Sequence, residues 1–344
     1  MTTQEALAAL VDGRSLDAST IEAVVSEVLS GEATQAQIGA LLVALRMKGE
    51  TIDELVGVAR ALRARAVAIP AAPAGAVDTC GTGGDAARTF NVSTAAAIVV
   101  AGAGVPVAKH GNRAVSGAVG SADVLETLDV RIDLAPAALA TCLDRVGIVF
   151  LYAPDLHPAM RALAGPRREL AMRTTFNLIG PLVNPAAVRR QVIGVFDARW
   201  LEPLAQVLHQ LGSERAWIVH GHGGLDELSL AGVSRIAELA DGRVRCREIR
   251  AADLGFEPVD VTALQVGSAG ESAERIESVL RGDAGPARDV VCLNAAAALV
   301  VAGRAPGLAA AAELAGEAID AGRAHRVLEE LRRFTHEHAG GGKA

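Results

Sequence analysis

The feature that most constrains this fold is a change of pattern near residue 76. From there onward, short β-branched runs alternate with alanine-rich stretches of helical spacing. This alternation predicts an α/β layer with a mainly parallel central sheet, because parallel strands are joined by crossover helices. The strand-like runs are VPVAKH (105–110), GIVFLYA (147–153), RQVIGVFD (190–197), RAWIVHG (215–221) and RVRCREI (243–249). Parallel sheets bind ligands at the carboxyl ends of their strands, so the polar motifs that follow these runs are the candidate site residues.

A small helical domain precedes this layer. In four places a hydroxyl side chain stands three residues before an acid or an amide: Thr2 and Glu5, Ser19 and Glu22, Thr34 and Gln37, and Thr51 and Glu54. Each pair is a possible capping box, in which the two side chains satisfy free amides at a helix start. The sequence thus predicts a helical domain over residues 1–70, joined by helices from about 158–185. After the linker PAAPAG (70–75), an α/β domain is expected over residues 76–344.

Composition narrows the class of partner and the compartment. The net charge of −7 argues against broad binding to nucleic acid or to anionic membranes. The four cysteines show no CxxC spacing and are expected to be reduced, mostly buried thiols of an intracellular protein. The N-terminus lacks the basic start of a signal peptide, and no apolar run reaches the length of a membrane span. We therefore expect a cytoplasmic protein without nucleic-acid or membrane partners.

The stretch DTCGTGGDAARTFNVST (78–94) carries the glycine-rich loop. Residues 81–86 fit the dinucleotide fingerprint GxGxxA, but the position for its ribose-binding acid, about 20 residues on, is basic. A plain glycine turn is a further alternative. Asn91, Ser93 and Thr94 stand at the start of an apolar helix, and a helix N-terminus attracts phosphate. The loop therefore indicates a phosphate-bearing ligand, although Asp85 places a negative charge directly behind its glycines.

Two basic stretches follow the next strands. Lys109 is the only lysine between residues 48 and 343, and it stands in KHGNR, ahead of Ser116 and Ser121. An isolated surface lysine is the alternative, but this cluster favours an anion site. Further on, Arg167 in GPRREL is part of a solvated helix face or holds a carboxylate as a bidentate fork. The segment FNLIGPLVNP (176–185) is equally well explained as a structural loop or as a functional one.

The acidic pair Asp226–Glu227 stands in a glycine loop, HGHGGLDELSL (220–230). On a loop, both carboxylates can face one ion, and oxygen ligands without cysteine indicate Mg²⁺. A plain surface turn is the alternative. For His220 and His222 we favour structural roles over metal ligation, because no third ligand stands at a fitting spacing.

The motifs GTGGD, NVST, KHGNR, HPAM…RREL, RTTFNLIGPLVNP and HGHGGLDELSL occur in this order from about Asp78 to Gly303. Together they resemble the anthranilate phosphoribosyltransferase family. The resemblance implies a nucleoside phosphorylase/phosphoribosyltransferase-like fold, with a small N-terminal helical domain, a large α/β domain and a cleft between them. It also implies a Mg²⁺-dependent homodimer that joins anthranilate to 5-phosphoribosyl 1-diphosphate and releases pyrophosphate, in tryptophan biosynthesis.

Site residues follow from this resemblance, motif by motif. Phosphoribosyl diphosphate would contact Gly81, Gly84, Asp85, Thr89, Asn91, Val92, Ser93, Thr94, Lys109, Arg113, Ser116, Gly117 and Ser121. Anthranilate would contact Gly81, His110, Asn112 and Arg167, and magnesium would be held by Ser93, Asp226 and Glu227. His110 is the nearest candidate for a catalytic base, although orienting the substrate is an equally good role. The loop RAVSGAVGSAD (113–123) departs from the family pattern, because Gly117 and Ala118 remove side-chain donors that the family more often has there.

Two other functions remain open at this point. A pyrimidine nucleoside phosphorylase of the same fold would resemble KHSTGG around the lysine, whereas this chain has KHGNR. A non-catalytic relative that binds nucleic acid should have a degraded GTGGD or Asp-Glu motif, and both are intact here.

Overall fold

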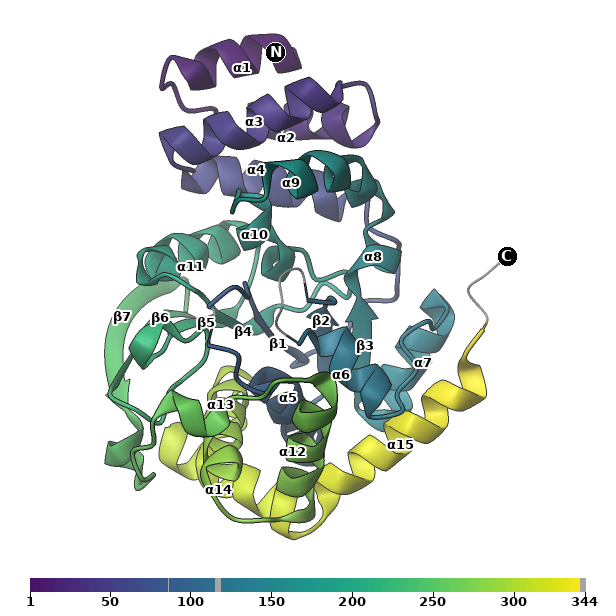
Figure 1. Cartoon of the computed structure of the whole chain (residues 1–344), viewed down its shortest axis with the longest axis vertical. Helices are drawn as coiled ribbons and strands as arrows, with labels where there is room; N and C mark the ends of the chain where they lie inside the picture. Colours follow the sequence, from purple (N-terminus) through teal and green to yellow (C-terminus); the bar gives the residue numbers. More distant parts are fainter. Residues whose placement is uncertain (86, 115–118, 341–344) are drawn as a thin grey trace.

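A seven-stranded sheet forms the centre of the larger part of the molecule (Figure 1). The computed structural model describes residues 1–85, 87–114 and 119–340. The strand order is β3-β2-β1-β4-β5-β6-β7, and the first five strands are parallel. The strands are β1 (Val77–Gly81), β2 (Val107–Gly111), β3 (Ile148–Tyr152), β4 (Arg190–Gly194), β5 (Arg215–His220), β6 (Val233–Ala240) and β7 (Arg243–Arg250). The mainly parallel sheet is therefore confirmed, and β6 and β7 extend it as an antiparallel hairpin.

Helices pack on both faces of the sheet. The helices of the α/β part are α5 (Val92–Gly102), α6 (Ser121–Thr127), α7 (Pro136–Val146), α8 (Ala153–Leu156), α11 (Leu201–Gln210), α12 (Ala269–Arg281), α13 (Pro286–Val301), α14 (Leu308–Asp320) and α15 (Arg323–His338). One core lies between the sheet and α5, α13 and their neighbours, and it includes the fully buried middle of α13. The other core joins α11 and the opposite face of the sheet to the N-terminal helices. The sheet thus separates two hydrophobic cores, which makes it the rigid support for the loops at its carboxyl edge.

The N-terminal helices are α1 (Thr3–Val11), α2 (Ala18–Leu29), α3 (Gln35–Lys48) and α4 (Ile52–Arg63). They lie together at one end of the molecule (Figure 1). The chain returns to them later, where α9 (Ala164–Leu170) contacts α3 and α10 (Phe176–Ile179) contacts α4. These contacts agree with the predicted joining helices from about 158–185, and the domain boundaries themselves stay a prediction.

Local capping chemistry explains where these helices begin. The boxes at Thr2, Thr34 and Thr51 are confirmed, with both reciprocal hydrogen bonds present. The box at Ser19 is wrong, because Asp17 caps α2 instead. The Asp17 carboxylate accepts hydrogen bonds from the Thr20 amide at 2.8 Å and the Ser19 hydroxyl at 2.7 Å. Ser19 consequently lies inside the helix, where its hydroxyl donates to the capping residue Asp17.

Other expectations about the chain differ in detail. β1 and β6 are not among the five predicted strand runs, and the segment FNLIGPLVNP forms α10 and a 3₁₀ turn over Gly180–Val183. Three of the four cysteines are buried and Cys246 is exposed on β7. Among the described residues no single helix has the length and apolarity to cross a membrane, and only the bent pair α12–α13 meets those two criteria jointly.

A buried ion pair ties the helical part together. The Glu54 carboxylate, at the start of α4, accepts hydrogen bonds from Lys48 Nζ at 2.9 Å and from the amides of Leu16 at 3.0 Å and Thr51 at 2.9 Å. The side chains of Lys48 and Glu54 are 7% and 0% exposed. Removing one partner of such a pair leaves the other buried and uncompensated.

We therefore expect Glu54→Ala to lower the free energy of unfolding of the helical part by about 3–5 kcal/mol. Urea titration followed by circular dichroism measures this change. The matched control is Asp53→Ala, which removes an exposed acid from the same helical turn and should change stability by less than about 1 kcal/mol. Equal effects of the two substitutions would contradict the role of the buried pair.

Candidate active site

The candidate site lies where the sheet changes its winding direction. From β1 the chain adds β2 and β3 on one side, and it then returns to add β4 and β5 on the other side. The loops that follow β1 and β5 meet at this point, as expected for the carboxyl edge of a doubly wound sheet. Gly83 N–H donates to Asp226 Oδ2 at 2.9 Å, and Ser93 N–H donates to Glu227 Oε1 at 3.1 Å. The structure therefore brings the glycine loop, the start of α5 and the acidic pair together across more than 130 residues of sequence.

Two glycines make room for the acidic loop. A Cβ atom on Gly81 would lie 2.6 Å from Asp226 Oδ2, and one on Gly194 would lie 1.4 Å from the Asp226 carbonyl oxygen. These two glycines are register partners at the ends of β1 and β4. Gly194 was missed by sequence reasoning. The sequence feature that could have indicated Gly194 is its position at the end of a β-branched run, since Gly81 likewise ends β1.

Asp85 closes the glycine loop. Its Oδ1 accepts a hydrogen bond from Ala87 N–H at 3.1 Å, and its Oδ2 accepts a long one from Asp226 N–H at 3.4 Å. The acid behind the glycines therefore binds backbone amides of its own loop and of the acidic loop. Helix α5 begins only at Val92, after the loop has ended, which excludes the dinucleotide fingerprint because that motif needs its helix to begin within it.

The acids of this site are crowded and short of partners. Burial raises the pKa of Asp226 to about 7, and the neighbouring Asp85 charge adds to this shift. Burial, with the charges of Asp226 and Asp85, also raises the pKa of Glu227 well above its ordinary value. Glu227 Oε2 is buried and has no hydrogen-bond partner within the described ranges. A cation is the group that relieves both the repulsion and the missing partner.

The residues present fit a magnesium ion that is shared with a ligand. No group of three or more His, Cys, Asp or Glu side chains forms a ready-made metal site in the part of the chain that the structure describes. Mg²⁺, however, is usually held by one or two carboxylates, together with water and substrate phosphates. Asp226, Glu227 and the hydroxyl of Ser93 offer such an incomplete set.

Lys109 provides the cation nearest to these acids. Its ammonium group donates to the carbonyl of Thr79 and to Ser93 Oγ, the latter at 3.3 Å. The residue is only 3% exposed, so the alternative of a solvated surface lysine is wrong. Burial lowers its pKa, whereas Asp78, Cys80 and the acidic pair raise it. Lys109 therefore places its charge directly beside the start of α5.

His110 is buried against a second histidine. Its Nδ1 lies 3.1 Å from the carbonyl oxygen of Gly180, so Nδ1 carries the proton and donates it. Its Nε2 has no partner among the described residues, and its ring centroid lies 5.2 Å from that of His157. Burial lowers the pKa of His110 to about 3 and that of His157 to about 4. Both rings are consequently neutral near pH 7, and His110 is too weak a base to remove a proton on its own account.

The Arg167 guanidinium has no counter-charge among the residues that the structure describes. It projects from α9, is partly buried and lies over the Phe176 ring at 6.0 Å. It makes no hydrogen bond or ion pair with any residue the structure describes. Its donors are therefore available to a carboxylate ligand, whereas Arg168 next to it is exposed to solvent.

A second arginine of this segment was not assigned to the site from sequence. Arg173 donates to the carbonyl of Gly84, and its guanidinium lies over the Phe196 ring at 4.1 Å. It thereby links the segment between α9 and α10 to the glycine loop.

Arg113 is directed elsewhere. Its guanidinium binds Glu126 at 2.8 Å, Asp123 at 3.0 Å and the Tyr152 hydroxyl at 3.2 Å. Two acids of α6 thus already compensate its charge, and the predicted donor contact through Arg113 would require these pairs to break. Ser116 and Gly117, which were predicted to contact the same ligand, lie outside the described residues.

The other predicted contact residues surround the start of α5. Asn91 Nδ2 donates to the Val119 carbonyl at 2.8 Å, and Asn91 Oδ1 accepts from Ser272 Oγ at 2.8 Å. Val92 and Thr94 are buried on α5, and Thr89 forms an isolated β-bridge with Gln265. Ser121 is the first residue of α6, and its hydroxyl donates to the Asn112 carbonyl. The Asn112 side chain is exposed. Asn91 therefore fixes the helix start relative to the segment that precedes α6.

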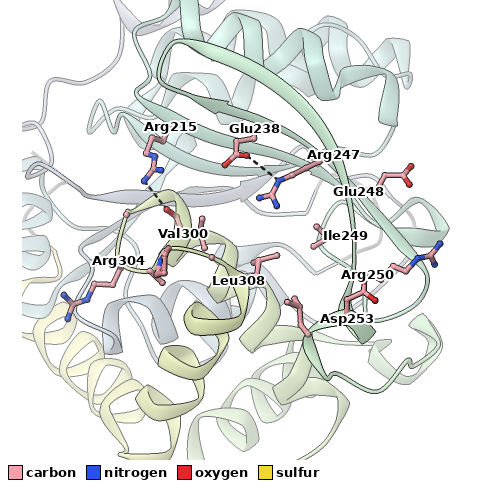
Figure 2. Close-up of a pocket in the computed structure, with 15 residues that line it drawn as sticks. Arg215, Glu238, Arg247, Glu248, Ile249, Arg250, Asp253, Val300, Arg304 and Leu308 are labelled. Atoms are coloured by element: carbon pink, nitrogen blue, oxygen red, sulfur yellow. Dashed lines mark hydrogen bonds and ion pairs between the residues drawn. The ribbon is translucent and has the colours of Figure 1, made fainter.

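A cavity of about 820 Å³ lies away from these residues, between β5–β7 and the α13–α14 connection (Figure 2). Figure 2 shows that its arginines are partly engaged, since Arg247 pairs with Glu238 and Arg215 donates to the Val300 carbonyl. None of the predicted site residues lines it. The chemistry is therefore assigned to the carboxyl edge of the sheet and not to this cavity.

Comparisons with known proteins show the family of the chain and its fold. Residues 74–325 match the family model described as glycosyl transferase family, a/b domain, and residues 4–66 match the helical bundle domain of the same family. The chain is 54% identical over 332 residues to an anthranilate phosphoribosyltransferase of Desulforudis audaxviator, which covers 96% of each chain. The crystal structure of the anthranilate phosphoribosyltransferase from Thermus thermophilus has a TM-score of 0.91 at 38% identity, over 96% of this chain and 99% of that one.

The enzyme of this name from Saccharomyces cerevisiae, in complex with PRPP and Mg, has a TM-score of 0.89 over 97% of this chain and 98% of that one. At 24% identity, this likeness shows the shared fold.

The low pKa values of the two buried histidines generate a prediction. The ordinary pKa is 6.5, and the folded values are about 3 for His110 and about 4 for His157. Since these values are lowered, the neutral rings stabilise the fold above about pH 6.5 and lose this contribution as the pH falls toward 4 and then 3. Imidazole NMR signals of His110 and His157, assigned with His→Gln variants, should stay unchanged between about pH 8 and pH 5. An inflection near the ordinary pKa in either signal would contradict the burial argument.

Proposed function

This chain belongs to the anthranilate phosphoribosyltransferase family, and we propose that its residues at the carboxyl edge of the sheet carry out that family's reaction. It transfers the phosphoribosyl group of 5-phosphoribosyl 1-diphosphate to anthranilate, in L-tryptophan biosynthesis. The products are N-(5-phosphoribosyl)anthranilate and pyrophosphate. The observation that carries our assignment of the site is the meeting of the glycine loop, Ser93, Lys109 and the pair Asp226–Glu227.

The donor side of the site is the glycine loop and the start of α5. The Gly84 amide and the Ser93 hydroxyl would bind phosphate oxygens of the donor. The amides of Gly83 and Ser93 already donate to Asp226 and Glu227, so they would act by holding the acidic pair in place. Lys109 would add a positive charge that is already fixed in place by the Thr79 carbonyl and Ser93 Oγ. Because this charge is preorganised, it can stabilise the departing pyrophosphate without further rearrangement.

We propose Ser93, Asp226 and Glu227 as the protein ligands of Mg²⁺. Their support is the unpartnered Glu227 Oε2 and the mutual repulsion of the acids. Bound Mg²⁺ supplies electrostatic stabilisation of the leaving diphosphate. Asp85 contributes by holding the loop through Ala87 and Asp226, which keeps the metal ligands in position.

The acceptor side consists of His110 on β2 and Arg167 on α9. The Arg167 guanidinium would bind the carboxylate of anthranilate, and the unprotonated Nε2 of His110 would accept a hydrogen bond from its amine. We propose that His110 orients the acceptor, because its low pKa makes it a poor general base. Aligning the amine with the anomeric carbon is then the main contribution of this side.

The two other candidate functions have no such support. The relatives support the phosphoribosyltransferase reaction and not a nucleoside phosphorylase. The intact, connected GTGGD and Asp-Glu motifs also differ from what we expect of a relative that has lost catalysis and binds nucleic acid. The homodimer and the cytoplasmic location stay predictions.

The function predicts turnover that depends on both donor and metal. Anthranilate fluorescence should decrease when 5-phosphoribosyl 1-diphosphate and Mg²⁺ are both added, and stay constant when either is omitted. Asp226→Asn and Glu227→Gln should raise the Mg²⁺ concentration for half-maximal rate by at least about 10-fold, because each removes one ligand charge. Glu274→Gln on α12, an exposed acid, is the control. An unchanged metal titration in both site variants would remove the pair from the metal site.

The acceptor assignment predicts selective damage from one arginine. Arg167→Ala should raise the KM for anthranilate about 10- to 100-fold, the cost of a lost charge-assisted fork. It should leave the KM for the donor nearly unchanged. Arg168→Ala tests the exposed neighbour and should change neither constant. Equal increases in both KM values for Arg167→Ala would reject the carboxylate role.

A further inference from the structure

The two central strands that carry the site separate at their carboxyl ends. β1 pairs with β4 over five residues, and β2 pairs with β3 over five residues. Between β1 and β2, in contrast, only Val77 and Val107 are paired. The sheet is therefore continuous on both flanks but open in its middle, directly below the glycine loop and KHGNR.

This opening leaves specific backbone groups without their usual partners. In an uninterrupted parallel ladder, the Thr79 carbonyl would accept from His110 N–H, and the Ala108 carbonyl would accept from the amide of Thr79. Buried backbone groups of this kind must find other partners, because an unpaired one is costly.

Side chains take over three of these ladder positions. Asp78 Oδ1 accepts from His110 N–H at 3.1 Å. Asn184 Nδ2 donates to the Ala108 carbonyl at 2.8 Å, and Lys109 Nζ donates to the Thr79 carbonyl. Asp78 Oδ2 also accepts from Asn184 Nδ2 at 2.9 Å, which joins the first two substitutions into one network. We call Asp78 and Asn184 the wedge pair.

The wedge pair is fully enclosed and has no direct route to a ligand. Asp78 is 0% exposed and Asn184 is 4% exposed. Asn184 is further fixed by accepting a hydrogen bond from Ala186 N–H at 2.9 Å. The pair therefore connects β1, β2 and the segment after α10, which carries the Gly180 carbonyl that holds His110. Its effect on a reaction must pass through the residues that it positions.

We propose that Asp78 and Asn184 are positioning residues, which hold β1 and β2 apart and so set the distance between the donor loop after β1 and the acceptor residue His110. The proposal rests on the proposed function, since it concerns the geometry of that reaction. A closed ladder would draw Thr79 and His110 together by one backbone hydrogen bond. In the open ladder, side chains bind the Thr79 carbonyl and His110 N–H instead. The wedge pair therefore sets the spacing between the donor loop and His110.

Isosteric exchanges test this pair. Asp78→Asn replaces two acceptor oxygens by one oxygen and one NH₂ group. The NH₂ donor then faces another donor, either His110 N–H or the Asn184 amide. Asn184→Asp sets two carboxylates against each other. Each single variant should lower kcat/KM about 100-fold, the size of effect expected from a displacement of about 1 Å. The double variant Asp78→Asn/Asn184→Asp again pairs a donor with an acceptor and should recover about 10-fold of that loss.

Hydrogen exchange provides a readout that does not depend on turnover. In Asp78→Asn, peptides that span residues 107–112 should exchange faster than in the wild type, whereas those of β4 should not. Gln191→Leu is the matched control. Gln191 is equally buried, is the register partner of Asp78 on β4 and donates to the Pro181 carbonyl, but it lies on the closed side of β1. This control should lose thermal stability and keep the KM values and the 107–112 exchange close to wild type.

The outcomes separate the two proposals. Wild-type turnover with undiminished kcat/KM in both folded single variants would overturn the positioning role and leave the proposed function standing. Absence of wild-type turnover would overturn the proposed function, and the exchange of residues 107–112 would then decide whether the wedge pair holds β2. If Asp78→Asn does not fold, Asn184→Ser carries the test, because it keeps Asp78 and removes only the bridging amide. A double variant that is no better than the single variants would contradict the direct pairing.

Discussion

The hydrogen bond from Gly83 N–H to the Asp226 carboxylate is the contact on which the site depends. It joins the loop after β1 to the loop after β5, and it forms only because Gly81 and Gly194 leave the ends of their strands without side chains. Any Cβ at Gly194 would overlap the Asp226 carbonyl. Gly81 and Gly194 therefore let the acidic loop approach the ends of β1 and β4 closely.

Electrostatics makes the same site costly in the absence of a ligand. Asp226 and Glu227 are buried beside Asp85, and their pKa values are raised because each charge is short of water and close to another. The charge of Lys109 offsets part of the electrostatic cost of the buried acids, and Mg²⁺ with a diphosphate would offset more of it. Because the pKa of Asp226 is raised to about 7, a cation that binds this carboxylate would release its proton near neutral pH. The proposed acceptor side has the opposite character, with two neutral histidines and an arginine that has no ion-pair partner in the described ranges. The two sides that we propose for the metal-bound donor and for the acceptor therefore differ in charge.

Much of this was predictable from local patterns. Strand–helix alternation predicted the α/β layer, and hydroxyl–acid spacing correctly predicted three helix starts, because both signals act within a few residues. The fourth start was wrong for a local reason as well: the helix begins two residues earlier, because the Asp17 carboxylate accepts from the Thr20 amide and from the Ser19 hydroxyl. β6 escaped prediction because its sequence, VSRIAELA, mixes charged and apolar residues without a regular alternation, and its burial does not alternate either. The resemblance assigns Arg113 to the donor, and this stays a prediction. The folded chain sets two acids of α6 against Arg113, which its motif did not indicate.

The sequence by itself determined which chemical groups are present and in what order: a glycine loop, a lysine, a histidine, an arginine and an acidic pair. The tertiary structure decided which of them meet and in what state of charge. Asp78 and Asn184 are 106 residues apart, and Gly83 and Asp226 are 143 residues apart. No short-range sequence pattern can encode contacts between residues so far apart in the chain. These contacts depend on the order of the strands in the sheet and on the opening between β1 and β2. The same is true of the pKa values, since burial and neighbouring charges exist only once the chain has folded.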